Sequence, residues 1–200
     1  VELLENDLVQ PEDRPRFLGR IHQEAQRLVS LINDILGLSQ LDEGAAMPRE
    51  SVSLLSLAQE AAASLSAAAQ AQNVTLTVNG TAGTLTGVRR LLSETVRNLC
   101  ENAVKYNVPG GSITVTVAET PQAVTLTVAD TGIGIPPADQ SRVFERFYRV
   151  DKSHSRAIGG TGLGLSIVKH AVAYHHGTVQ LDSTPGQGTV ITVTLPKDAA

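Results

Sequence analysis

The feature that most constrains the fold is a regular alternation of apolar residues with threonine in three separated segments. The alternating apolar residues are Ile113, Val115 and Val117, then Val124, Leu126 and Val128, and finally Ile191, Val193 and Leu195. A period of two places such side chains on one face of a strand and the intervening threonines on the other. The pattern therefore predicts three half-buried strands that belong to a sheet with one face in the core.

Longer segments before and between these strands have a different pattern. Helices are predicted at residues 54–72, 88–106 and around 163–176, and a further strand is predicted at 74–78. Helices inserted among such strands bury their apolar side against one face of the sheet. The predicted fold class is α+β, a two-layer α/β sandwich with a mixed sheet, preceded by an α-helical hairpin.

The hairpin is predicted from the first part of the chain. Residues 1–9 read as the end of one helix, Gln10–Asp13 as a turn around Pro11, and residues 14–41 as a second helix. Three- and four-residue steps give the second helix an apolar stripe consisting of Phe17, Ile21, Ala25, Leu28, Ile32 and Ile35.

Two helices alone bury such stripes poorly, so we expect a homodimer in which two hairpins form a four-helix bundle. The alternative is that the hairpin packs on the domain that follows it. Residues 44–49 contain Gly and Pro and are predicted to be a linker. The predicted domains are accordingly 1–45, the hairpin, and 46–200.

The composition and the first residues of the chain indicate which class of protein to expect. A hydrophobic share of 42% in 200 residues is enough for a packed core. Cys100 is the single cysteine and has Leu99 beside it, so it is expected to be a core residue. The sequence has no signal peptide and no apolar run of the roughly 20 residues that cross a bilayer. Because the chain opens inside a predicted helix, we expect it to be part of a longer protein, which leaves a membrane segment upstream possible.

Charge is unevenly distributed along the chain. Residues 1–45 carry 4 Arg against 9 Asp and Glu, whereas the remainder carries 12 basic and 11 acidic residues. One short stretch concentrates basic residues, namely Arg142, Arg146, Arg149, Lys152 and Arg156. A nucleic-acid surface requires a basic domain and aromatic platforms, and only 3% of residues are aromatic. The expected partner of this stretch is a local anion such as a triphosphate, with no nucleic acid.

Four separated motifs require a common explanation. They are NLCENAVKY at residues 98–106, DTGIGI at 130–135, FERFYR at 144–149 and GGTGLGLSIV at 159–168. In order and spacing they resemble the N box, first glycine box, F box and second glycine box of sensor histidine kinases, in the ATPase superfamily shared with gyrase, MutL and the heat-shock chaperones. The resemblance spans residues 51–197 and is weaker over the hairpin.

The resemblance implies a fold and an activity. The fold is the Bergerat ATP-binding fold. The activity is transfer of the γ-phosphate of ATP to a histidine, with Mg²⁺ as a second cofactor and a response regulator as the partner in a two-component system. The full-length protein is then expected in the bacterial cell membrane, with this domain in the cytoplasm.

The N box supplies most of the candidate polar contacts. Asn98 and Asn102 are four residues apart on a predicted helix, so they share a face. Mg²⁺ takes oxygen ligands and usually only one or two protein groups beside phosphates. The resemblance assigns the metal to Asn102 and makes Asn98 a second polar contact. Glu101 lies about 100° around the helix from Asn102 and could approach a reactant at the helix edge. The candidate catalytic residues are Asn98, Glu101 and Arg149.

Other candidates concern the nucleotide itself. Lys105 suits a phosphate and Tyr106 could lie against adenine, although a surface lysine and a core tyrosine are the alternatives. Asp130 follows a predicted strand and precedes Gly132 and Gly134, where an ionised carboxylate can accept a hydrogen bond from the exocyclic amine of adenine. The sequence Asp-Thr-Gly also occurs in aspartic proteases, but that alternative explains none of the other boxes.

The second glycine box predicts an anion site at the start of a helix. Unpaired amides and the positive end of the helix dipole bind phosphates there. The residues concerned are Gly160, Thr161, Gly162, Leu163 and Gly164. The box does not follow a strand that closes a βαβ unit, and it lacks the Gly-Lys-Ser/Thr ending of a P-loop, so both of those nucleotide folds are disfavoured.

Residues 150–158 lie between the F box and these glycines and are predicted to be a mobile lid. Arg149 or Lys152 could reach the terminal phosphate from there, with a solvated charge cluster as the alternative. Thr189 matches a family position near the adenine, with an ordinary strand threonine as the alternative.

The phosphoacceptor histidine of the family is missing. It belongs in the first hairpin helix, in a His-Glu/Asp-x-Arg/Lys-Thr/Ser-Pro pattern that this sequence lacks. His22 lies in the second predicted helix, and the remaining histidines, His154, His170, His175 and His176, lie in the predicted ATP-binding domain. Two further functions stay open: an ATP-hydrolysing conformational switch, whose members carry Glu at the position of Asn98, and a non-catalytic nucleotide-binding module.

Overall fold

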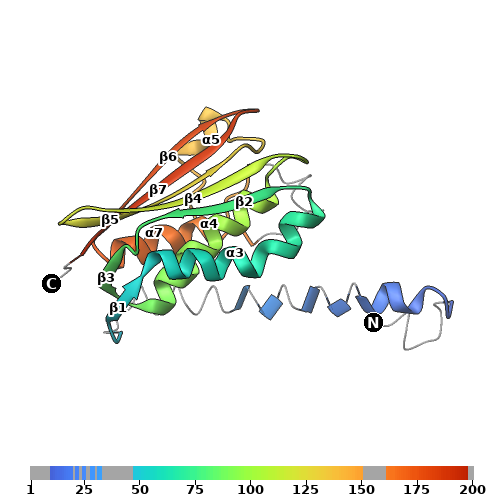
Figure 1. The fold of residues 1–200 in the computed structure, drawn as a ribbon. Helices are drawn as coiled ribbons and strands as arrows, with labels where there is room; N and C mark the ends of the chain where they lie inside the picture. Colours follow the sequence, from blue (N-terminus) through green and yellow to red (C-terminus); the bar gives the residue numbers. More distant parts are fainter. Residues whose placement is uncertain are drawn as a thin grey trace.

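The computed structural model describes residues 10–19, 21–22, 24–25, 28–29, 31–32, 47–150 and 161–197. Residues 14–19 and the described residues between 21 and 32 are helical, and the rest of the described chain contains seven strands and four helices. The strands are β1 (Glu50–Ser53), β2 (Thr75–Gly80), β3 (Thr84–Gly87), β4 (Ser112–Glu119), β5 (Ala123–Asp130), β6 (Thr178–Thr184) and β7 (Gly188–Pro196). The helices are α3 (Leu54–Ala71), α4 (Arg89–Lys105), α5 (Pro137–Gln140) and α7 (Gly164–Tyr174). A sheet forms one layer, and α3, α4 and α7 form the other (Figure 1).

The main sheet has five strands in the order β2-β4-β5-β7-β6. The β2–β4 pair is parallel and the other pairs are antiparallel, so the sheet is mixed, as predicted. Strands β1 and β3 form a separate antiparallel ribbon. The sequence patterns did not reveal β1, β3 or β6, because β1 and β3 are short and each buries a single large apolar residue, Val52 or Leu85.

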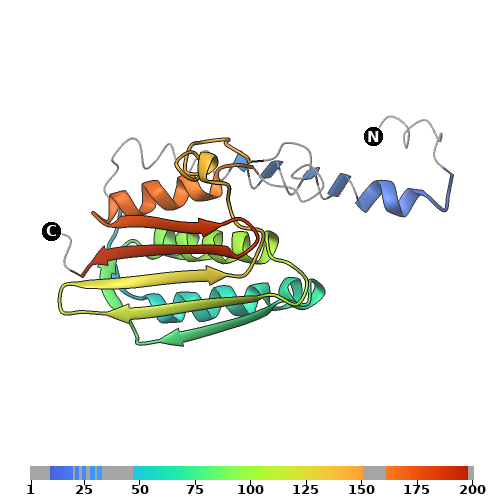
Figure 2. The ribbon, with the colours of Figure 1, turned by 90° about the horizontal axis from the view of Figure 1, so that it is seen from above.

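The three alternating segments form β4, β5 and β7, and their apolar rows are buried beneath the helices. Figure 2 shows the helices along one face of these strands, which leaves the other face uncovered by helices. Cys100 of α4 is fully buried in this core. Burial, assisted by the charge of Glu101, raises the pKa of its thiol to about 12. The thiol therefore stays protonated and Cys100 is a core residue, as predicted.

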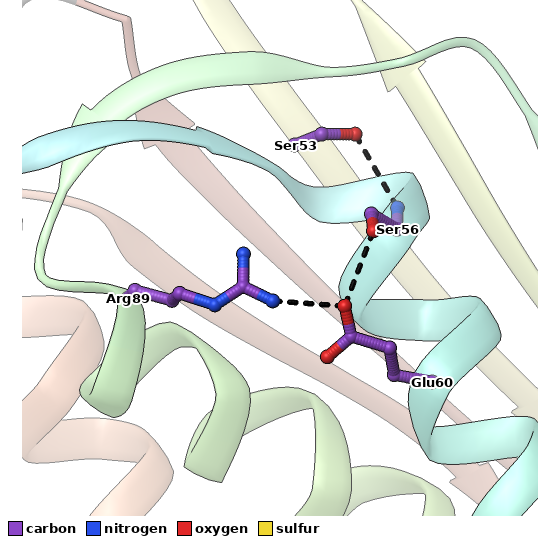
Figure 3. A network of polar contacts seen from close by, with 4 residues as sticks. All are labelled: Ser53, Ser56, Glu60 and Arg89. Atoms are coloured by element: carbon purple, nitrogen blue, oxygen red, sulfur yellow. Dashed lines mark hydrogen bonds and ion pairs between the residues drawn. The ribbon is translucent and has the colours of Figure 1, made fainter.

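Polar contacts between α3 and α4 fix the start of α4 (Figure 3). The Ser53 hydroxyl caps α3 by accepting the Ser56 amide hydrogen, with N and O 3.3 Å apart. Ser56 Oγ donates to Glu60 Oε1 (3.2 Å), and Arg89 Nη2 contacts the same oxygen at 2.8 Å. Both ends of the Arg89–Glu60 pair are about half exposed, so its contribution to stability is small.

The hairpin residues divide into two groups. Leu31 packs against Leu163 and Ile167 of the following domain, as the alternative prediction required. Four other apolar residues are more than half exposed: Leu18 (58%), Leu28 (58%), Val29 (58%) and Ile32 (55%). Ile35, which completes the predicted stripe, lies outside the described residues. Within the described segments, no helix is both long enough and apolar enough to cross a membrane.

Candidate functional site

At one edge of the sheet, three adjacent strands carry polar residues on the face that packs against the helices. Strands β5 and β6 end at this edge and β7 begins there. The register pairs Asp130 of β5 with Thr189 of β7, and Thr189 with Ser183 of β6. Each of the three continues a row that is apolar further along its strand, as Val128 precedes Asp130 on β5. The strand ends therefore form a polar edge on an otherwise apolar surface.

Asp130 is held in place by backbone amides. Its Oδ1 accepts hydrogen bonds from Gly132 N (2.8 Å) and Thr189 N (3.3 Å). Burial raises the pKa of the carboxyl, and the two amide hydrogen bonds offset only part of that rise. Both bonds end at Oδ1, which leaves Oδ2 to accept a hydrogen bond from a ligand.

The first glycine box packs against the end of the helix that carries the N box. Ile133 N donates to the Tyr106 carbonyl oxygen at 3.0 Å. A β-carbon at Gly132 would lie 2.3 Å from that same oxygen. Gly134 has a φ of +68°, and a β-carbon there would lie 2.2 Å from the Thr184 carbonyl oxygen. Glycine is required at both positions because the backbone segments touch.

The second glycine box packs against the middle of α4. The side-chain nitrogen of Asn98, Nδ2, donates a hydrogen bond to the Glu94 carbonyl oxygen (2.8 Å). A β-carbon at Gly164, the first residue of α7, would lie 2.7 Å from Asn98 Oδ1. Asn98 therefore contacts the start of α7, and Asn102 is half-buried one turn further along α4.

Gly164→Ala tests this contact. Alanine normally favours a helix, but here its methyl group must displace the Asn98 side chain. Overpacking of this kind costs about 2 kcal/mol, so we expect the free energy of unfolding to fall by about that amount. Gly19→Ala is the control, because a β-carbon there meets nothing within 4 Å. Equal free energies of unfolding of the two variants in urea titration would disprove the importance of the contact.

The F box is tied to the second glycine box through the backbone. Phe147 N donates to the Gly162 carbonyl oxygen at 2.9 Å. Phe147 has a φ of +64°, which is strained for an aromatic residue, and its side chain is 60% exposed. Thr161 Oγ1 accepts the Leu163 amide hydrogen (3.2 Å) just before α7 begins. Among the predicted residues, Gly160 and Lys152 lie outside the described residues, as does the predicted lid apart from Val150.

The predicted phosphate-binding side chains gather around Tyr106. Lys105 Nζ lies 5.3 Å from the centre of the Tyr106 ring. Burial raises the pKa of the Tyr106 hydroxyl, and the positive charge of Arg149 partly opposes the rise. One cation, Lys105, is therefore placed at the tyrosine ring, and the charge of Arg149 acts on the same hydroxyl.

The other predicted residues have different surroundings. Glu101 forms an exposed ion pair with Arg97, with Nη1 and Oε1 3.0 Å apart. His22 and His176 are exposed, whereas His170 Nδ1 lies 2.7 Å from the Ser166 carbonyl oxygen. His175 is fully buried, and both of its ring nitrogens form hydrogen bonds with the backbone.

Sequence reasoning missed Ser183 and Gln140. The signal for Ser183 was available: on β6 it follows Val179 and Leu181 at the same two-residue spacing that marks Asp130 on β5. Gln140 had no comparable signal, because it lies on the short helix α5 and reaches its partners through a turn.

Comparison with known proteins decides the family. Residues 87–199, more than half of the chain, match the family of histidine kinase-, DNA gyrase B-, and HSP90-like ATPases. The chain belongs to this family of ATPases. Residues 1–44 match the His Kinase A (phospho-acceptor) domain. The chain has the two layers and the mixed sheet that the sequence predicted (Figure 1).

The relatives of this ATPase domain are sensor histidine kinases. The sensor-like histidine kinase SenX3 of Mycolicibacterium smegmatis is 37% identical over 189 residues, which cover 94% of this chain and 49% of the relative. The solved mycobacterial sensor histidine kinase MprB is 30% identical with a TM-score of 0.64, covering 74% of this chain and 97% of that one. Full-length ShkA, solved with AMPPNP, has a TM-score of 0.78 and 28% identity and covers 99% of this chain and 42% of that one. The chain thus spans about half the length of SenX3.

The side chains of the ATPase site offer too few oxygen atoms to hold Mg²⁺ without a nucleotide. Among the described residues, no group of three or more His, Cys, Asp or Glu side chains is placed to hold a metal. The half-buried amide of Asn102 offers a single oxygen beside Asn98. Mg²⁺ fits such a site, because it commonly binds one protein group, waters and the phosphates of a nucleotide.

Proposed function

We propose that this chain binds ATP with Mg²⁺ and transfers the γ-phosphate to a histidine for relay to a response regulator. The observation that carries the proposal is the meeting of all four boxes around α4: Gly132 contacts Tyr106, Gly164 contacts Asn98, and Gly162 is bonded to the F box. The relative solved with AMPPNP supports an adenine nucleotide as the ligand.

Each part of the nucleotide has a place in this proposal. Asp130 and Thr189 bind the adenine, which lies against Tyr106. The phosphates lie at the start of α7, where Gly162, Leu163 and Gly164, with Gly160 and Thr161 before them, supply backbone amides. Asn102 holds Mg²⁺, and Asn98, Lys105 and Arg149 contact the phosphates or the metal.

Phosphoryl transfer requires positioning and charge stabilisation more than covalent chemistry by the protein. Lys105 lies at the Tyr106 ring and the charge of Arg149 acts on the Tyr106 hydroxyl, so they can balance negative charge that develops on the transferred group. Bound Mg²⁺ would neutralise part of the phosphate charge. Removal of Asn102 therefore weakens the metal-dependent part of binding most.

Transfer to histidine fits this site better than hydrolysis does. An amide at position 98 cannot take a proton from water, and the Asn98 nitrogen is already bonded to the Glu94 carbonyl. Glu101, the other candidate base on α4, is paired with Arg97. Glu101 is the one carboxylate in the N box, and this pair with Arg97 competes with a role as a base.

The binding test is calorimetric titration with a nonhydrolysable ATP analogue, with and without Mg²⁺. We expect saturable binding that Mg²⁺ strengthens, and an Asn102→Ala variant that loses most of the Mg²⁺-dependent gain. A chain that binds the analogue in neither condition would refute the proposed function.

The transfer test uses labelled ATP. We expect no acid-labile, base-stable phosphate on the chain alone, and transfer to a longer version of the protein that carries the acceptor histidine. A phosphohistidine mapped to His22, His154, His170, His175 or His176 of the chain alone would show that the acceptor has been wrongly placed.

We further propose that the chain dimerises through its hairpin, residues 1–45, with the ATP-binding domain at 46–200. The exposed side chains of Leu28 and Ile32 support this proposal, because the described residues leave them more than half uncovered. In the full-length protein the domain would lie on the cytoplasmic side of the membrane.

Ile32→Asp should weaken the dimer. Burying one charge per chain in the bundle costs several kcal/mol, so the dissociation constant should rise at least about a hundredfold. Sedimentation velocity across a concentration series measures this, with Arg16→Gln, an exposed position away from the apolar stripe, as the control. A parent chain that stays monomeric at every concentration would contradict the proposed bundle.

A further inference from the structure

A polar network that includes none of the box side chains lies directly behind Thr189. Ser183 Oγ is its centre and has three contacts. It accepts the Ile135 amide hydrogen (N···O 2.8 Å), donates to the Gly188 carbonyl oxygen (2.9 Å), and lies 2.9 Å from Thr189 Oγ1. Gly188 is buried at the start of β7.

The contacts determine which hydroxyl donates. A carbonyl oxygen can only accept, so the single hydrogen of Ser183 is used on Gly188. The hydrogen between Ser183 and Thr189 must then come from Thr189. Thr189 therefore points its hydrogen toward Ser183 and retains lone pairs on its other side.

Gln140 keeps Ser183 in this arrangement. Its side-chain nitrogen donates to the carbonyl oxygens of Ile135 (2.9 Å) and Ser183 (2.7 Å), so both amide hydrogens are used. The loop after the first glycine box is thereby fastened to β6. The direction of the Ile135 amide toward Ser183 Oγ follows from that attachment.

Asp130 adds a second acceptor at the same edge. It is the register partner of Thr189, and its Oδ1 accepts the Thr189 amide hydrogen. An ionised carboxylate has no hydrogen to donate. Asp130 and Thr189 together thus offer acceptors, with no donor, to a group that lies against the strand ends.

We propose that Ser183 is a positioning residue for base selection: by taking the Thr189 hydrogen, it makes the Asp130–Thr189 edge favour a purine with an exocyclic amino group over one with an oxo group there. This inference rests on the proposed function, because it assumes that the nucleotide base lies at Asp130. A purine amino group supplies two hydrogens, which suits two acceptors. An oxo group meets those acceptors with lone pairs and is disfavoured.

The test compares the β,γ-imido analogues of ATP and inosine triphosphate by calorimetric titration. Their bases carry an amino and an oxo group at that position, and the adjacent ring nitrogen changes from an acceptor to an N–H donor in both the parent and the variant titrations, so the readout is the change in the affinity ratio between the two proteins. Without Ser183, Thr189 is free to rotate and donate to the oxo group. We expect Ser183→Ala to reduce the adenosine-to-inosine affinity ratio about tenfold, the effect of one lost hydrogen-bond preference. Ser183→Thr keeps the hydroxyl and should keep the ratio. Thr178→Ala, on the exposed face of the same strand, should leave both affinities unchanged.

Gln140→Ala tests the support of Ser183. It should reduce the adenosine-to-inosine ratio in the same direction as Ser183→Ala but by less, because Ser183 keeps its own contacts with Gly188 and Thr189. A parent chain that binds neither analogue would refute the proposed function itself. A parent chain that prefers adenosine, together with an unchanged ratio or complete loss of binding in Ser183→Ala, would refute the role of Ser183 alone.

Discussion

Asp130→Asn is expected to lower the affinity for an ATP analogue about a hundredfold, through about 3 kcal/mol of lost interaction. The substitution preserves shape, so the asparagine oxygen can still accept the Gly132 and Thr189 amide hydrogens that now reach Oδ1. The asparagine nitrogen then occupies the place of Oδ2 and presents a donor to the exocyclic amine of adenine. Two opposed donors replace an ionic hydrogen bond.

Calorimetric titration of the folded variant measures this loss. Asp182→Asn is a matched control, because Asp182 is exposed on the other face of β6. Thermal unfolding of both variants shows whether the fold is retained. If Asp130→Asn bound the analogue as tightly as Asp182→Asn, adenine recognition by Asp130 would be wrong.

His175→Phe is expected to lower the free energy of unfolding by about 2 kcal/mol above neutral pH. The fully buried His175 ring joins the end of α7 to the start of α4. Its Nδ1 lies 2.7 Å from the Ala171 carbonyl oxygen and so carries the hydrogen, while Nε2 accepts the Val88 amide hydrogen at 2.9 Å. Phenylalanine fills the volume but leaves the buried Val88 amide without a partner.

The same ring should make stability depend on pH. Burial lowers the pKa of His175, and the charges of Arg49 and His176 lower it further, against the opposing effect of the Ala171 carbonyl. The unfolded chain therefore binds a proton at a higher pH than the folded one. The stabilisation is complete above the unfolded pKa of about 6.5 and is lost as pH falls from there toward the lowered folded pKa.

Urea unfolding at a series of pH values tests both statements. The difference between the parent chain and His175→Phe should shrink as pH falls from about 7.5 to about 5.5, because phenylalanine does not titrate. His22→Asn, at an exposed position of the hairpin, should keep the parent's pH dependence, because His22 is not among the groups that shift the pKa of His175. A constant difference across this range would mean that His175 does not set the acid limit of stability.

The pattern and composition of apolar residues predicted the strands β2, β4, β5 and β7 and the helices α3, α4 and α7, because each contributes apolar side chains to the core. The order of the four boxes, through their resemblance to the histidine kinases, likewise predicts the family. The same resemblance predicts Asp130 and Thr189 as site residues.

Tertiary structure alone decided which residues meet. The strand register brings Ser183 to Thr189, although Ser183 belongs to no box and β6 has a weak apolar row. Packing of α7 on α4 requires glycine at 164, because the Asn98 side chain occupies the space of a β-carbon. Nothing in the sequence distinguishes His175 from the other four histidines. Its burial between α7 and α4 keeps the ring neutral, so that Nε2 can accept the Val88 amide hydrogen. Periodicity reports which side of an element is buried, whereas contacts between elements depend on register and crossing geometry, which a single sequence does not record.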